Sequence, residues 1–122
     1  MNSVNLIGRL TKNADLKNIT NNEKGKDSKV ANFTIAVKDR FSDDTDFISI
    51  EVWGKNAEFC ERNFTKGRLV SVEGVLKINS RKSENGEYKI YTKVRAEKVS
   101  VLDKKKDEVF EEVSYEGTPF ED

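Results

Sequence analysis

Residues 45–55 alternate between two kinds of side chain, and this pattern constrains the fold more than any other in the chain. Successive side chains of a β-strand point to opposite faces, so a period of two predicts a strand. One predicted face is aliphatic and carries Ile48, Ile50 and Val52. The other face carries Phe47, Ser49, Glu51 and Trp53. The aliphatic face has to be buried, whereas two rings among polar residues suit stacking against flat groups. The alternative is that both rings pack beneath a loop or a helix.

Other segments also alternate, and one changes period. Strands are predicted at residues 4–11, 29–38, 45–55, 68–78 and 88–102. In residues 55–63, Ala57 and Cys60 recur at helical spacing, which predicts a helix with Asn56 as its N-cap. The polar segment 12–29 is expected to be a long connection with a frayed strand near residues 16–19. Asn85-Gly86 predicts a hairpin turn within the loop 79–87.

This order of elements indicates a fold class. Five strands with one helix between the third and the fourth are typical of an OB-fold, an all-β Greek-key barrel. Gly74 is expected to bend the fourth strand where the barrel turns a corner. The residues expected to face inward on the last two strands are Val70, Val72, Leu76, Ile78, Ile90, Val94 and Ala96.

The charge is distributed unevenly, although the chain has 22 basic and 22 acidic residues. Residues 107–122 contain seven acids and no Lys or Arg. The first 106 residues hold all 22 basic residues and the remaining 15 acids, a net charge of +7. A basic body with an acidic end predicts a polyanionic partner for the body and a separate role for the end. The alternative is an ordinary solvated surface.

The residue types that are absent argue against catalysis. There is no histidine, which removes the commonest general base and metal ligand. Cys60 is the only cysteine, so we expect no disulfide, no thiolate metal site and a reducing compartment. No apolar run is long enough for a signal peptide or a membrane span, so we expect a cytoplasmic protein without cofactor or metal. Asp43, Asp44 and Asp46 keep a metal-dependent nuclease open as an alternative, but their spacing matches no calcium loop.

Four motifs carry a resemblance to a known family. They are VNLIGRLT at residues 4–11, VANFTIAV at 30–37, DFISIEVWGKNAE at 46–58 and KGRLVSVEG at 66–74. In this order they resemble the bacterial-type single-stranded DNA-binding proteins over residues 1–102. The resemblance implies an OB-fold, sequence-independent binding and protection of single-stranded DNA during replication, recombination and repair, and a homotetramer. An OB-fold that binds RNA or another protein is the alternative.

The resemblance also implies site residues. Phe47 and Trp53 fall where the family places base-stacking aromatics on the third strand, and Phe41 where it places another. Arg81 stands where a fourth aromatic is usual, so we expect weaker stacking and more dependence on salt there. Tyr91, or Tyr88 less strongly, is a further stacking candidate. The basic residues predicted to contact phosphates are Arg9, Lys12, Lys38, Arg40, Lys55, Lys77, Arg81, Lys82, Lys93 and Arg95.

Residues 103–122 are predicted to be a separate acidic tail after a DNA-binding domain at residues 1–102. The excess of acids and the absence of a periodic apolar face favour disorder. By resemblance, Pro119, Phe120, Glu121 and Asp122 are expected to recruit replication, recombination and repair proteins. Relatives end on Pro-Phe, whereas here Glu121 and Asp122 follow, which moves the terminal carboxylate two residues away from Phe120. Three alternatives stay open: a partner tolerates this shift, Phe120 docks without the carboxylate, or the partners are different ones, as in a phage or plasmid version. A purely solubilising tail is the alternative.

Overall fold

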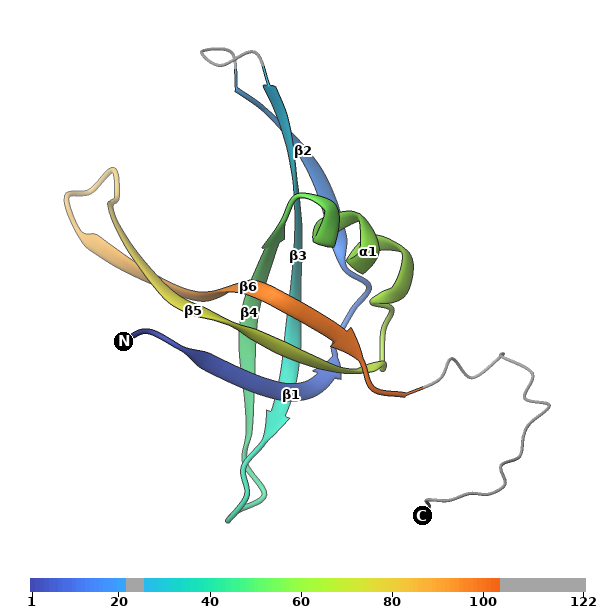
Figure 1. Cartoon of the computed structure of the whole chain (residues 1–122). Coiled ribbons are helices and arrows are strands. Elements are labelled where there is room, and N and C mark those ends of the chain that lie inside the picture. The colour runs from blue at the N-terminus through green and yellow to red at the C-terminus, as the bar shows by residue number, and fades with distance from the viewer. Residues whose placement is uncertain (22–25, 104–122) are drawn as a thin grey trace, which may run out of the picture.

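The computed structural model describes residues 1–21 and 26–103, which form mainly β-strands (Figure 1). The strands are β1 (Val4–Leu10), β2 (Asp15–Asn21), β3 (Lys26–Lys38), β4 (Thr45–Trp53), β5 (Leu69–Lys82) and β6 (Tyr88–Val101). The helix α1 (Lys55–Asn63) follows β4 directly. Its bounds agree with the change of period after Gly54.

Five of the strands pair in a ring. Hydrogen-bonded neighbours follow the order β1, β5, β6, β4 and β3, and a further pairing of β3 with β1 closes the ring. Two of these strand pairings extend over only two or three residues. The β1–β3 join has the register pairs Arg9–Ala36 and Leu10–Ile35, and β4 runs parallel to β6 over residues 50–52 and 94–96. The predicted all-β OB-fold barrel is therefore confirmed, with α1 between the third and fourth strands of the ring.

The prediction for residues 12–29 is wrong in one respect. Instead of a long connection with a frayed segment, the chain forms the seven-residue strand β2, which pairs antiparallel with β3 from Asp15–Asn32 to Asn21–Lys26. Since β2 lies outside the ring, its backbone bonds to β3 while few of its side chains help to fill the core. A strand of this kind needs no alternating apolar pattern, and the sequence shows none.

The barrel interior is filled from the ring strands and from α1. Its buried residues are Leu10, Ala31, Phe33, Ile35, Ile50, Val52, Ala57, Cys60, Phe64, Val70, Val72, Val94 and Ala96. Phe64 packs edge-on against Phe33, with 5.1 Å between ring centroids. Burial raises the pKa of Cys60 to about 12, so its thiol stays protonated near neutral pH.

The beginning of α1 differs from the prediction. Gly54 is the N-cap residue, and no side chain caps the helix. Asn56 lies two residues beyond the N-cap position, and its side-chain amide donates a hydrogen bond to the carbonyl oxygen of Glu97 at 3.4 Å. The predicted cap is therefore wrong, and Asn56 ties α1 to β6.

Gly74 lies where β5 changes register against β6. It is buried and opposite Ala96, and a Cβ atom at this position would overlap the carbonyl oxygen of Arg95. The predicted bend at Gly74 is confirmed, because the two backbones approach too closely here for any other residue.

Beyond this bend, β5 and β6 continue as a two-stranded arm that projects from the barrel (Figure 1). The arm comprises residues 75–82 and 88–93. The pairing of β1 with β5 ends at Gly74, and β6 pairs with β4 only from Val94 onward. Consequently Leu76, Ile78 and Ile90, predicted to face inward, are 40, 60 and 70% exposed. That prediction is wrong because the barrel interior does not extend beneath the arm.

The described chain ends at an ion pair. Arg68 donates from Nε to Oδ1 of Asp103 at 3.1 Å and from a terminal nitrogen to the Asp103 carbonyl oxygen at 2.9 Å. The end of β6 is thereby fixed to the barrel. The predicted partner-binding residues Pro119, Phe120, Glu121 and Asp122 lie outside the described residues, as does nearly all of the predicted tail. Among residues 1–21 and 26–103, no helix has the length and apolar character needed to cross a membrane.

Candidate nucleic-acid interface

The outer face of β4 carries both aromatic side chains that the alternating pattern predicts to be outside. Phe47 is 68% exposed and Trp53 39% exposed, while Ile50 and Val52 on the other face are buried. The two rings are six residues apart, or roughly 20 Å at the usual rise of a strand. Neither ring fills the core. The alternative that both rings pack beneath a loop or a helix does not hold for Phe47, whereas the less exposed Trp53 borders the first turn of α1. Their contact with bases stays a prediction.

A groove of about 420 Å³ crosses this face. Its lining comes from the β1–β2 connection, β3, β4 and β6, and includes Lys12, Asn32, Ser49, Tyr91 and Lys93. Asn32 and Thr34 of β3 are the register partners of Glu51 and Ser49 of β4. Strands that are far apart in the sequence thus contribute polar, aromatic and basic groups to one channel.

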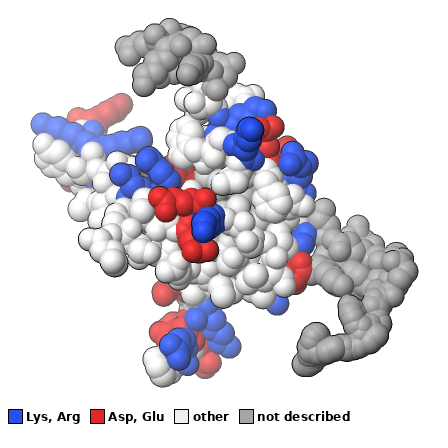
Figure 2. All heavy atoms as spheres, in the orientation of Figure 1, with Lys and Arg blue, Asp and Glu red and all other residues white. Residues whose placement is uncertain are grey.

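The arm extends the same face with positive charge. In register, Lys77 lies opposite Lys93, Asn79 opposite Tyr91, and Arg81 opposite Lys89. The Arg81 guanidinium lies over the Tyr91 ring, 5.6 Å from its centroid. Basic side chains gather along the arm in Figure 2. Lys82 instead pairs with Tyr88, which places both on the other face of the arm.

Glu51 is the buried acid of this face. It is 6% exposed, and its two carboxylate oxygens accept from Lys93 Nζ at 3.3 Å and from Arg95 Nε at 2.9 Å. Burial favours a higher pKa for Glu51, but hydrogen bonds from Arg95, Trp53 and Lys93 and the charge of Lys93 outweigh it and hold that pKa below its usual value. Two of the predicted phosphate contacts are therefore paired with a carboxylate.

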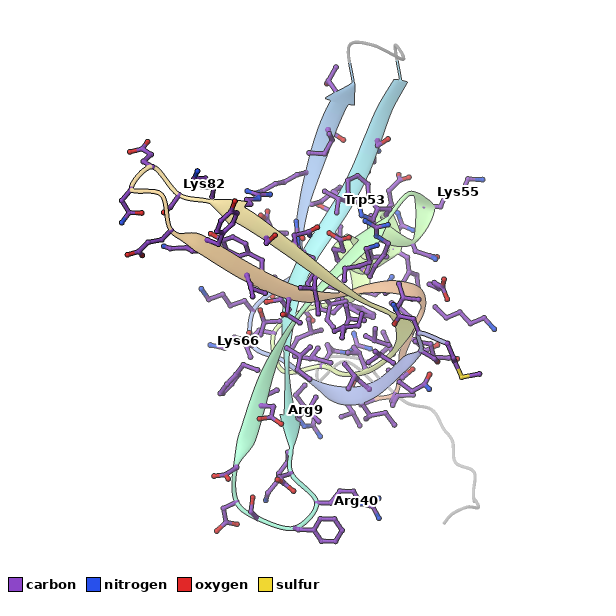
Figure 3. All side chains as sticks on the ribbon, turned by 90° about the vertical axis from the view of Figure 1, so that its left-hand side faces the viewer. Arg9, Arg40, Trp53, Lys55, Lys66 and Lys82 are labelled. Carbon is purple, nitrogen blue, oxygen red and sulfur yellow. The ribbon has the colours of Figure 1, made fainter. Side chains whose placement is uncertain are left out.

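Lys38 is the last residue of β3, and the loop that follows it carries Arg40 and Phe41. Phe41 is 90% exposed, and the Arg40 guanidinium lies 5.5 Å from its ring centroid. The backbone amide of Asp39 donates to the carbonyl oxygen of Asp44 at 2.9 Å, which closes the loop. Figure 3 shows Arg40 at this tip, well away from Trp53, which lies beside the start of α1. The structure thus separates this group from Trp53.

The remaining predicted basic residues differ in position. Lys55 lines a second hollow beside Trp53, together with Lys29 (Figure 3). Arg9 lines neither hollow. Its guanidinium donates to the Gly67 carbonyl oxygen at 3.0 Å and to Asp103 at 3.3 Å. Arg9 therefore helps to hold the residues that follow β6, which makes it an unfavourable candidate for a phosphate contact.

Three residues of this surface were missed in the sequence. Lys89 shares the face of Tyr91 and Lys93, a position that the period of two along β6 indicates directly. Lys29 borders Trp53 and forms an ion pair with Glu58 at 3.3 Å. Glu51 is visible in the alternating pattern, but its basic partners come from β6 and no local signal points to them.

No group of three or more acidic, cysteine or histidine side chains suited to a metal ion occurs within residues 1–21 and 26–103. Asp43, Asp44 and Asp46 are among the residues described. The clustering of these aspartates, on which the nuclease alternative depends, is therefore not found.

Comparison with known proteins gives one consistent family. The model of the family described as "Single-strand binding protein family" matches residues 1–102. Single-stranded DNA-binding protein 2 of Clostridium acetobutylicum is 39% identical over an alignment that covers all of this chain and 91% of that protein. Single-stranded DNA-binding protein 1 of the same organism is 40% identical over 89% of this chain and its own full length. The protein of this name from Clostridium tetani is 38% identical over 84% of this chain and 71% of its own length.

The family match covers most of the chain, and the relatives align over most of their own lengths. The barrel, the helix position and the exposed face of β4 agree with the fold that the four sequence motifs imply. This chain therefore belongs to the single-strand binding protein family.

Proposed function

We propose that this chain binds single-stranded DNA without sequence preference and protects it, and that it catalyses no reaction. The observation that carries the proposal is the pair of exposed rings, Phe47 and Trp53, on a face bordered by a polar groove and a basic arm. The names of the relatives, which state single-stranded DNA binding, support it. Roles in replication, recombination and repair follow from the family resemblance.

The mechanism has an electrostatic part and a stacking part. Basic groups such as Lys12, Lys77 and Arg81 neutralise phosphates and release counterions, which gives a log–log salt slope of about −0.7 per phosphate for single strands. Bases then stack on Phe47 and Trp53, each stack contributing about 1–3 kcal/mol. Every base has a flat face, so stacking selects no sequence. Paired bases offer no free face, so duplex DNA is excluded.

Titration with oligo-dT tests this proposal through the fluorescence of Trp53, the only tryptophan in the chain. We expect oligo-dT to quench the emission, because a base stacks on the indole, and an equally long duplex to leave it nearly unchanged. Absence of quenching, or equal quenching by duplex, contradicts the proposal. A clear preference for poly-U over poly-dT favours the RNA-binding alternative instead. Loss of the oligonucleotide on incubation with magnesium or calcium favours the nuclease.

We also propose that the chain forms a homotetramer, supported by the face of the arm opposite the basic one. This face exposes Leu76, Ile78, Tyr88 and Ile90, which lie on neighbouring strands in register. An apolar stripe of this kind is typical of a surface that another protein covers. A second copy is the partner that the family resemblance implies.

Substitution of the stripe tests the assembly. We expect Ile78→Asn with Ile90→Asn to lower the mass measured by sedimentation equilibrium, because burying two amides without partners disfavours association. The matched control is Lys77→Asn with Lys89→Asn, at neighbouring positions on the opposite face, which should retain the native mass. Equal masses for the native chain and the Ile78/Ile90 variant would contradict the proposed interface.

The acidic segment is proposed to recruit partner proteins through Pro119, Phe120, Glu121 and Asp122. Its support is the sequence: an aromatic residue among acids, attached to a basic domain. Basic pockets on partners would recognise this chemistry by charge and by insertion of the Phe120 ring.

A further inference from the structure

Glu51 is a buried acid on the face proposed for DNA. It lies on the same face of β4 as Phe47 and Trp53, and Arg95 is its register partner on β6. Its side chain is 9% exposed, whereas those of Lys93 and Arg95 are 33 and 48% exposed. The carboxylate therefore lies beneath two basic groups that remain accessible from solvent.

This arrangement determines the local charge that an approaching phosphate would encounter. The three side chains carry a local charge of +1, not the +2 of Lys93 and Arg95 alone. A phosphate that approaches them also approaches the carboxylate, which is held in place by burial and cannot turn away. Part of the attraction is therefore already satisfied within the protein before DNA arrives.

We propose that Glu51 is an internal counter-anion of the DNA-binding face, which competes with phosphates for Lys93 and Arg95 and thereby weakens both the affinity for single-stranded DNA and its dependence on salt. The inference rests on the proposed function. It assigns to Glu51 a role opposite to that of the surrounding residues, since it limits binding. The same contacts join β4 to β6 at their short parallel pairing, which gives the chain a structural reason to retain the acid.

The first test is Glu51→Gln, which keeps the shape of the side chain and removes its charge. Binding of labelled oligo-dT is measured by fluorescence anisotropy from about 50 to 500 mM salt. We expect the log–log slope to become steeper by about 0.7, which is a gain of about 5-fold in affinity for each tenfold lowering of salt. Anisotropy is preferred to tryptophan emission because Trp53 adjoins Glu51.

The matched control is Glu61→Gln, the same change of charge at an exposed position of α1. Glu61 has no ion pair within the described parts of the chain. We expect its slope and affinity to equal those of the native chain. An unchanged slope for Glu51→Gln, or weaker binding, overturns the proposal. Weaker binding would instead identify Glu51 as a residue that positions Lys93 and Arg95 for DNA.

A second pair of variants leaves Glu51 in place. It tests whether Glu51 competes with phosphates for Lys93 even if Glu51→Gln does not fold. Lys77 lies opposite Lys93 in register and has no ion pair within the described residues. Lys77→Gln should lower the steepness of the slope by about 0.7, and Lys93→Gln by clearly less, because Glu51 already neutralises part of that charge. Equal losses overturn the proposal. If the native chain fails to bind oligo-dT, the proposed function itself is wrong. If it binds, and Lys77→Gln and Lys93→Gln reduce the salt slope equally, only the role of Glu51 is refuted.

Discussion

Alanine at both Phe47 and Trp53 weakens the binding of oligo-dT by about 30-fold or more. Each stacked base contributes about 1–3 kcal/mol, so loss of two stacks removes at least about 2 kcal/mol. Both side chains are exposed on the outer face of β4, so their removal leaves the barrel core intact. Anisotropy of a labelled oligonucleotide measures the effect, since the variant has no tryptophan.

Two controls separate stacking from other causes. The salt slope of the double variant should equal that of the native chain, because no charge has changed. Leucine at both positions preserves apolar contact but offers no flat face, so it should bind nearly as weakly as alanine. Native affinity in the alanine variant, or full recovery with leucine, would show that these rings are not the platform for bases.

Gly74→Ala lowers the free energy of unfolding by about 3 kcal/mol, near the upper end of the usual cost of overpacking. The added methyl group would overlap the carbonyl oxygen of Arg95, and backbone atoms cannot move aside as a side chain does. The barrel would have to widen where β6 crosses β5. Urea denaturation at a fixed chain concentration measures the change.

The matched control is Gly86→Ala in the hairpin turn. Gly86 has a φ of 87°, and apart from its chain neighbours no residue lies within 4 Å of an added Cβ, so the cost arises from the backbone conformation alone. We expect about 1 kcal/mol from the left-handed conformation. A loss at Gly74 no larger than that at Gly86 would mean that the strands can separate at the bend.

Local pattern identified several features that depend on neighbours in the chain, although it placed the cap of α1 at Asn56 instead of Gly54. The period of two identified which face of β4 is buried, the period of the helix located α1, and Asn85-Gly86 identified the hairpin. These features depend on strand geometry and turn chemistry, which act within a few residues.

Features that depend on distant pairing were not predictable in the same way. Alternation assigned Leu76 and Ile78 to one face, but it cannot tell whether a core lies beneath that face. For Glu51, burial results from Lys93 and Arg95, which come from a strand more than 40 positions away. For β2, the missing apolar pattern hid a strand held by its backbone pairing with β3.

The arm has one further consequence, for how sequence variation in this chain should be interpreted. Its odd-numbered residues, such as Lys77 and Tyr91, present the side proposed for DNA, and its even-numbered residues, such as Ile78 and Ile90, present the side proposed for self-association. Solvent-exposed positions are ordinarily tolerant of substitution. Under these two assignments both sides of the arm contact a partner. Random mutagenesis should therefore find its exposed positions as intolerant of substitution as those of the barrel interior.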